Sequence, residues 1–145
     1  NINLIFIGDG PEEKNLKKQV SKLNLNSRIK FFNGTYSEKK IEKYYESAIA
    51  TISYGQAGLA ILQSFGHGVC FITTKDAISG GEISNINNFE NGILIDNKEN
   101  EIDNIICLLA NNKYIAEYLG ENAYFFYKNN ATLKNMVTSI QMLIK

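Results

Sequence analysis

The chain has 145 residues, enough for one domain with a sizeable core, and its apolar fraction of 44% and charged fraction of 21% are ordinary for a globular protein. Fifteen basic residues balance fifteen acidic ones, so no net field favours nucleic acid, and we expect no nucleic-acid partner. No apolar run approaches the length of a membrane span and no leader opens the chain, so we expect a cytoplasmic protein without a transmembrane segment.

Apolar runs of strand length alternate along the chain with segments of helical periodicity. Strands are predicted at residues 2–7, 28–33, 49–53, 69–74 and 92–96. Helices are predicted from the start signal Pro11, after Ser37 as an N-cap, at 59–65, around 102–109, at 114–127 and at 133–144.

The predicted strands are almost wholly apolar, which is typical of strands buried on both faces of a parallel sheet. Alternation with helices then predicts an α/β fold, a Rossmann-like doubly wound parallel sheet of about five strands with helices on both faces. We expect a single domain over residues 1–145. Cys70 and Cys107 lie within apolar runs, which predicts buried free thiols instead of a disulfide.

Ligands of such folds bind outside the carboxyl ends of the strands, here residues 8–11, 33–37, 53–58 and 74–82. The first of these contains Gly8-x-Gly10, but Glu13 stands where the dinucleotide motif needs its third glycine. Glu12 and Glu13 would also repel a pyrophosphate from the start of the next helix. A tight structural turn is therefore the prediction for this segment.

The stretch "SYGQAGLAILQSFGHG" differs, because its helix begins near Gly58 with no acidic residue in the first turn. Gly55 and Gly58 would allow the backbone to approach a ligand closely, as phosphate loops require. Gln63 lies far enough into the helix to reach a ribose hydroxyl from there. The alternative is that both glycines serve close helix–sheet packing and that Gln63 is an ordinary exposed residue. The residues alone leave both interpretations open.

Five segments resemble, in order and spacing, the nucleotide-binding half of group 1 (family 4) retaining glycosyltransferases, which are two-domain enzymes of the GT-B architecture. The resemblance extends from Asn3 to about Ala123. The segments are "LIFIGDGPEEKNLKK", "RIKFFNGTYSEKKIEKYYESA", "SYGQAGLAILQSFGHGVCFITT", "GGEI" and "NFENGILI".

The resemblance implies a site for a nucleotide-sugar donor. It assigns the base to Gly34, Thr35 and Tyr36, and the ribose to Gln63. It assigns the diphosphate to the turn from Gly55 to Leu59, which also contains Gln56, Ala57 and Gly58. Glu82 matches a frequent glutamate of the family. No metal or other cofactor is expected, because the family generally holds the diphosphate without one.

Two departures from the family bear on this site. Most members carry two glutamates, one touching the donor sugar and one the ribose, where this chain has Gly55 and Gln63. Gln63 can still exchange hydrogen bonds with ribose hydroxyls, whereas Gly55 offers no side chain to a sugar. The family's Arg and Lys that neutralise the leaving diphosphate have no equivalent here, and they would precede Asn1.

The missing Arg and Lys, together with an opening segment that resembles a strand already under way, predict a fragment that lacks the first strand and helix of its own domain and an N-terminal acceptor domain. Such a fragment would bind the donor without appreciable turnover, and no catalytic residue is assigned. Peripheral membrane association of a full enzyme stays open. The other hypotheses are a GT-B epimerase or another nucleotide-binding enzyme, and a non-catalytic Rossmann-like module. His67, at the far end of the helix from Gly58, is expected to be structural.

Overall fold

The computed structural model describes residues 2–96 and 98–144. Contacts between residues divide the chain into two compact units, Asn1–Tyr44 and Tyr45–Lys145. Both units contain parallel strands joined through helices, as the sequence predicts.

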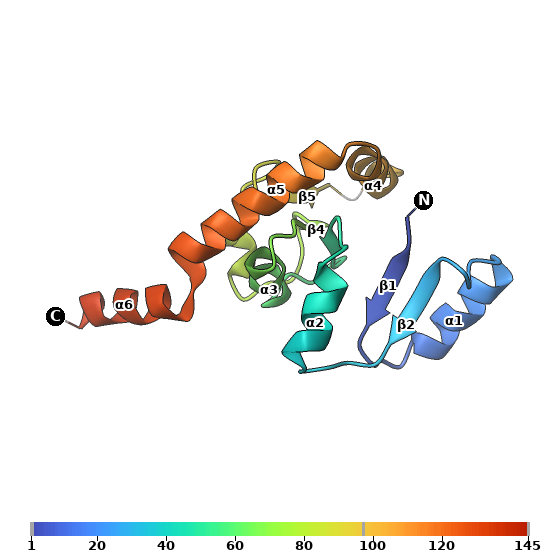
Figure 1. Cartoon of the computed structure of the whole chain (residues 1–145), viewed down its shortest axis with the longest axis horizontal. Helices are drawn as coiled ribbons and strands as arrows, with labels where there is room; N and C mark the ends of the chain where they lie inside the picture. Colours follow the sequence, from blue (N-terminus) through green and yellow to red (C-terminus); the bar gives the residue numbers. More distant parts are fainter. Residues whose placement is uncertain (1, 97, 145) are drawn as a thin grey trace. The chain divides into compact units, whose positions relative to one another are not determined.

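The first unit is a strand–helix–strand arrangement (Figure 1). β1 and β2 are parallel, with Leu4 opposite Ile29 and Ile7 opposite Phe32. Phe6 and Phe31 stack on neighbouring strands with ring centroids 5.0 Å apart. The elements are β1 (Leu4–Ile7), α1 (Glu13–Lys22), β2 (Ile29–Phe32) and α2 (Glu38–Tyr45), whose last residue belongs to the second unit.

Burial on both faces, predicted for all strands, is wrong for both strands of this unit: half-buried and exposed residues alternate in β2, and every residue is exposed in β1. Its four residues are between 36% and 45% exposed. Within this unit only α1 and the start of α2 are available to cover two strands, which is too little surface to bury both faces of a sheet. Val20 of α1 is buried, whereas Leu23, which follows the last residue of that helix, is exposed.

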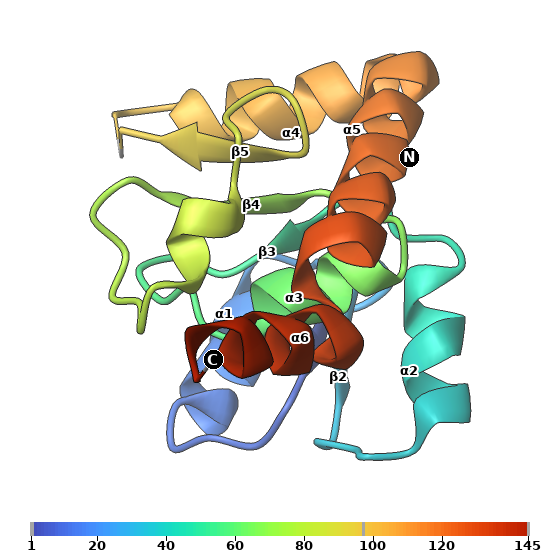
Figure 2. The same cartoon turned by 90° about the vertical axis from the view of Figure 1, so that its left-hand side faces the viewer.

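The second unit holds a three-stranded parallel sheet in the order β3–β4–β5, with Thr51 opposite Phe71 and Phe71 opposite Gly92. Figure 2 shows α5 running past the amino-terminal ends of β4 and β5 and beside the end of α3. The elements are β3 (Thr51–Ile52), α3 (Ala60–Gly66), β4 (Phe71–Thr74), the 3₁₀-helix η1 (Glu82–Asn85), β5 (Gly92–Ile95), α4 (Glu101–Asn111), α5 (Lys113–Phe126), the π-helix η2 (Tyr127–Ala131) and α6 (Leu133–Leu143).

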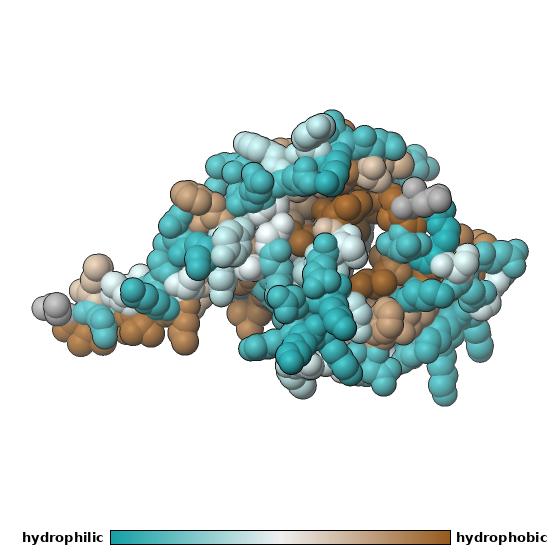
Figure 3. All heavy atoms as spheres, in the orientation of Figure 1, coloured by the Kyte–Doolittle hydropathy of each residue, from teal (hydrophilic) through white to brown (hydrophobic). Residues whose placement is uncertain are grey.

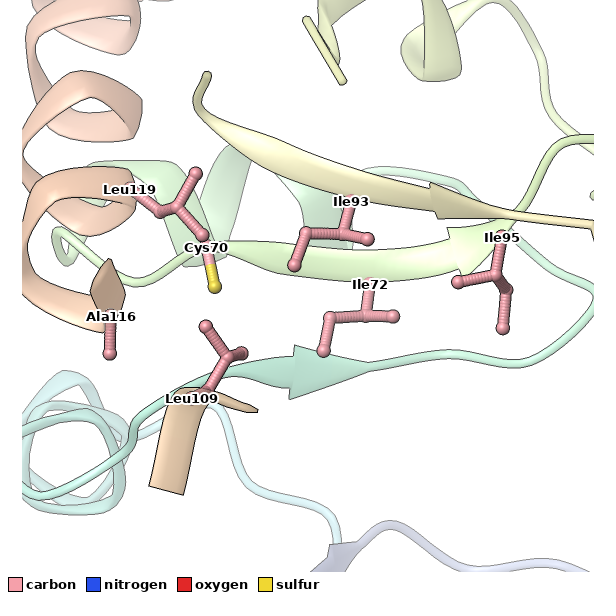
Figure 4. Close-up of a cluster of buried hydrophobic side chains, with 7 residues drawn as sticks. All are labelled: Cys70, Ile72, Ile93, Ile95, Leu109, Ala116 and Leu119. Carbon is pink, nitrogen blue, oxygen red and sulfur yellow. The ribbon is translucent and has the colours of Figure 1, made fainter. Parts of the chain in front are cut away.

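The core of this unit has two buried clusters, because successive residues of a strand point to opposite faces of its sheet. Ile72 of β4 belongs to one cluster and its neighbour Phe71 to the other. The first cluster joins the sheet to α4 and α5 (Figure 4) and consists of Cys70, Ile72, Ile93, Ile95, Leu109, Ala116 and Leu119. The second joins the sheet to α3 and consists of Ala57, Ile61, Phe65, Phe71, Ile86 and Ala123.

The two cysteines are both free, as predicted, but only one is buried. Burial raises the pKa of the Cys70 thiol to about 12. Cys107 is exposed, so the prediction that both thiols are buried is wrong for it. Leu109 provides the buried contact of α4, and Cys107 falls outside the stripe that helical spacing brings to the same face.

A close backbone approach fixes α5 against the connection between α3 and β4. A Cβ atom added at Gly120 would overlap the carbonyl oxygen of Gly68. Gly68 itself has φ +71, a conformation that L side chains rarely adopt. Each glycine is therefore required where it stands, and together they set the distance between α5 and the start of β4.

Thr132 caps the N-terminus of α6, and its hydroxyl accepts a hydrogen bond of 3.2 Å from the backbone N–H of Asn135. Apolar side chains gather along one side of this helix, at the left of Figure 3, and remain exposed to solvent. Among the helices that the structure describes, none is long and apolar enough to cross a membrane.

Candidate functional site

The segment from Ser53 to Leu59, called the β3 loop below, contains two glycines that the fold treats differently. Gly55 has φ +82, which favours glycine for the backbone conformation alone. Gly58 has no such φ, and a Cβ added there would meet no atom within 4 Å. The helix–sheet packing interpretation therefore does not explain Gly58, because nothing in the folded chain requires the absence of a side chain at that position.

The β3 loop is held by the segment from Lys75 to Gly81, called the β4 loop below. Ile78 donates its backbone N–H to the carbonyl oxygen of Gly55 at 3.0 Å and accepts from the N–H of Ala57 at 2.9 Å. Ala57 is fully buried in the second cluster. Ala77 of the β4 loop, and Ile83 just after that loop, pack against this cluster. Backbone pairing and shared packing thus join the loops at the carboxyl ends of two adjacent strands.

α3 begins at Ala60, two residues after the predicted Gly58. Leu59 occupies the N-cap position without a side-chain hydrogen bond, and the first turn holds no acidic residue. Gln63 is exposed and is the fourth residue of the helix, closer to its start than predicted. The N–H of Ile61 already donates to the carbonyl of Gly58 and that of Gln63 to the carbonyl of Leu59, each at 3.0 Å. By helix geometry the other N–H groups of the first turn have no partner inside the helix, so an acceptor from outside would bind those.

Glu82 folds back onto the β4 loop. Its carboxylate accepts a hydrogen bond of 3.2 Å from the hydroxyl of Ser79. That hydroxyl in turn accepts from the backbone N–H groups of Gly81 and Ile83, each at 3.1 Å. The N–H of Glu82 itself, then the Ser79 hydroxyl and the N–H of Gly80, hold the pKa of this carboxyl below its ordinary value. We call this arrangement the Ser79–Glu82 clasp.

Lys75, the basic residue that the sequence places nearest the proposed phosphate, forms an ion pair with Asp96. Lys98 also binds Asp96, at 3.1 Å. The hydrogen bonds from Lys75 and then Lys98 hold the pKa of the Asp96 carboxyl below its ordinary value. Asp96 therefore offsets the positive charge of Lys75 and joins the ends of β4 and β5.

The glycine pair at Gly8 and Gly10 forms a turn bound to the loop after β2, both within the first unit. Asp9 accepts a hydrogen bond of 3.0 Å from the backbone N–H of Gly34, and Gly8 donates to the carbonyl of Phe32 at 2.9 Å. The carboxylate of Asp9 is thus engaged with the chain itself. These contacts agree with the predicted structural turn.

The remaining candidates for the base lie on the same loop of the first unit. The hydroxyl of Thr35 accepts a hydrogen bond of 3.2 Å from the N–H of Ser37, which directly precedes α2. Tyr36 is fully exposed. The predicted residues from Gly55 to Leu59, Gln63 and Glu82 lie instead in the second unit, where the paired loops bring the β3 loop close to the segment that carries Glu82.

His67 lies at the C-terminal end of α3, the end opposite Gly58. Its ring stacks on Tyr45 with centroids 4.5 Å apart and planes 6° from parallel. Burial raises the pKa of the Tyr45 hydroxyl. This packing role matches the expectation for His67. In the part of the chain that the structure describes, no group of three or more His, Cys, Asp or Glu side chains is arranged to hold a metal ion.

Sequence reasoning identified the β4 loop as a strand end but missed the parts played by Ile78 and Ser79. Ile78 acts through its backbone, and its side chain, 75% exposed, gives no sequence signal. Ser79 was detectable, because Ser79-Gly80-Gly81-Glu82 has the Ser-x-x-Glu spacing of a capping box at the start of a helix.

The family model for group 1 glycosyl transferases matches residues 1–126 of the chain. No curated protein matches this chain. Among solved structures, sucrose-phosphate synthase from Thermosynechococcus elongatus superimposes with a TM-score of 0.80 at 19% identity, covering 98% of this chain and 37% of that one.

Two further structures share the fold. Anabaena HepE, solved in complex with UDP-glucose, has a TM-score of 0.77 at 19% identity over 99% of this chain and 41% of its own. The C-terminal domain of LpcC, a group 1 family protein from Francisella tularensis, has a TM-score of 0.72 at 20% identity over 90% of this chain and 70% of its own. The chain therefore spans about two fifths of the length of the synthase and of HepE.

Proposed function

Because the chain belongs to the group 1 glycosyl transferases, we propose that it binds a nucleotide-sugar donor for transfer of the sugar to an acceptor. Its α/β fold is that of one half of a GT-B enzyme, as predicted. The observation that carries the proposal is Gly58, which neither backbone conformation nor packing requires and which lies two residues before α3, a helix with no acidic residue in its first turn. A donor diphosphate lying against this backbone would explain the absence of a side chain.

The β3 loop would hold the diphosphate through backbone N–H groups, with Gln63 turned toward the ribose. Pairing with the β4 loop and burial of Ala57 support this role, because they fix the loop before a ligand arrives and so reduce the entropy lost on binding. The family resemblance assigns the base to Gly34, Thr35 and Tyr36. The complex of HepE with UDP-glucose is the parallel for such a donor.

Departure of the diphosphate builds negative charge on its oxygens, and stabilising that charge is the main electrostatic task of the reaction. Lys75 is the one basic residue of the β3 and β4 loops, and it is paired with Asp96. We infer that this chain alone binds donor without appreciable turnover. By the family resemblance, the neutralising cations would come from a first strand and helix of this same domain, and the acceptor would bind a separate N-terminal domain.

A thermal-shift panel of UDP, GDP, their sugar conjugates and NAD tests the proposal. A ligand that binds only the folded state stabilises it by an amount that grows with the logarithm of its concentration relative to Kd, so UDP or GDP should raise the melting temperature and NAD should not. Stabilisation by NAD with no response to either diphosphate would point to a dinucleotide enzyme. No response to any of them would favour a module that works through protein contacts.

A further inference from the structure

The Ser79–Glu82 clasp lies next to Ile78. In the described structure, Ile78 is the only residue that joins the β3 loop to the β4 loop by paired backbone hydrogen bonds. Ser79 directly follows Ile78, so a constraint on the Ser79 backbone is also a constraint on the Ile78 peptide. The hydroxyl of Ser79 accepts two backbone hydrogen bonds while donating to Glu82, and these three bonds constrain the turn. The clasp thereby fixes the part of the β4 loop that holds Gly55 and Ala57.

A second route joins the same two loops through packing. Ile83, whose N–H donates to the Ser79 hydroxyl, packs against the second buried cluster, of which Ala57 is a member. Opening the clasp would therefore loosen both the backbone pairing of Ile78 and a core contact of the β3 loop. Both consequences reach Gly55 and Ala57 without any contact between Glu82 and a ligand.

Glu82 itself is poorly placed to serve as a direct ligand contact. One carboxylate oxygen accepts from Ser79, and an ideal Cβ at Gly80 would lie 3.2 Å and 3.6 Å from the two oxygens, so the group lies against its own loop. A carboxylate turned toward a diphosphate would also disfavour binding through like charge.

We propose that Glu82 is a positioning residue, which closes the Ser79–Glu82 clasp and through Ile78 holds the β3 loop in its donor-binding conformation. This inference rests on the proposed function for its ligand, but the clasp and the loop pairing are properties of the chain alone. Two sets of measurements separate the two ideas.

The first set uses calorimetric titration of UDP and GDP into the 145-residue chain and its Ser79→Ala, Glu82→Ala and doubly substituted variants. Each single substitution should weaken nucleotide binding about tenfold, and the double variant should be no weaker than either, because both open the same clasp. Glu82→Gln, which keeps an acceptor for Ser79, should recover much of the affinity. Glu90→Gln, which changes an exposed acid outside the clasp, should bind as the parent chain does.

Losses that multiply in the double variant would show that Glu82 acts independently of Ser79 and would overturn the proposal. So would a loss confined to the sugar conjugate of the nucleotide that binds, since positioning of the β3 loop must affect the free diphosphate equally. Unchanged binding by Glu82→Ala would also overturn it. Circular dichroism melts of each variant establish that the compared chains are folded.

The second set needs no ligand and measures amide hydrogen exchange at Ala57 and Ile78, the two N–H groups of the loop pairing. Both should exchange faster in Ser79→Ala and Glu82→Ala than in Glu90→Gln. Equal exchange rates in the parent chain and in all three variants would overturn the proposal. If the parent chain binds neither UDP nor GDP, the proposed function fails, while the exchange rates still decide whether Glu82 holds the loop.

Discussion

At the scale of single residues, Gly58 and Gly10 both follow a parallel strand, and neither has a positive φ or an atom within 4 Å of an added Cβ. The space available for a side chain is therefore the same at Gly58 and Gly10 and does not distinguish the two positions. The surroundings do, because Gly10 leads into a helix with Glu13 in its first turn, whereas the helix after Gly58 has no acid there. Substitution at each position separates the two candidate phosphate loops.

Gly58→Asp should leave the chain folded, because the new side chain enters open space and an acid suits the start of a helix. Nucleotide affinity should fall at least about tenfold, since a carboxylate would meet the diphosphate at short range. Calorimetric titration of UDP and GDP checks this after the melting temperature has been compared with that of the parent.

Gly10→Ala is the matched control, and it should keep both stability and affinity. If Gly58→Asp binds like the parent chain while Gly10→Ala does not, the ligand lies on the first loop and the proposed site is wrong.

At the scale of elements, local pattern predicted the positions of the strands and helices to within about two residues. The strand predicted at 69–74 is β4 at Phe71–Thr74, and the helix predicted from Pro11 begins at Glu13. The spacing of apolar residues and the local composition are enough to predict these positions, because they indicate which face of a helix or strand is buried. They do not record long-range partners.

The elements that were missed depend on such partners. The π-helix η2 begins at Tyr127, whose ring lies 3.4 Å from where a Cβ of Gly66 would be, a contact across more than half of the second unit's sequence. For the same reason the β3 loop and Gln63 were identified from sequence as a candidate site, whereas the pairing through Ile78 was not. The exposure of β1 likewise depends on how much chain covers it.

The ends of β4 and β5 are joined by the ion pair of Lys75 and Asp96. Because these contacts lower the pKa of Asp96, their contribution is present above its ordinary value of 3.8 and is lost as the pH falls through the lowered value. Asp96→Asn should therefore lower the melting temperature slightly at neutral pH and leave it unchanged in strong acid. Thermal melts across this pH range check the expectation, with Glu90→Gln as a control for loss of an exposed acid. A difference that persists in strong acid would mean that Asp96 acts through something other than its charge.

At the scale of the whole molecule, the chain spans 37% of the synthase and 41% of HepE. We therefore expect that donor binding can be measured on this chain separately from sugar transfer.

The proposed donor site depends on backbone N–H groups and on Gln63, none of which needs a divalent cation to bind a diphosphate. Nucleotide affinity should therefore be the same with EDTA as with added Mg²⁺. Calorimetric titration in both buffers measures this, and a large loss on chelation would place a metal ion in the site.

The unequal burial of the two thiols gives the chain a single addressable position for chemical labelling. Cys70 is enclosed in the first cluster with its pKa raised to about 12, so at neutral pH it is neither accessible nor ionised, whereas Cys107 is exposed on α4. The thiolate is the reactive species, so a maleimide should modify the native chain once and the denatured chain twice. Mass spectrometry of the intact protein counts the adducts, and two adducts on the native chain would mean that the cluster around Cys70 opens readily. A fluorophore placed on α4 in this way would report on unfolding of the second unit without any substitution.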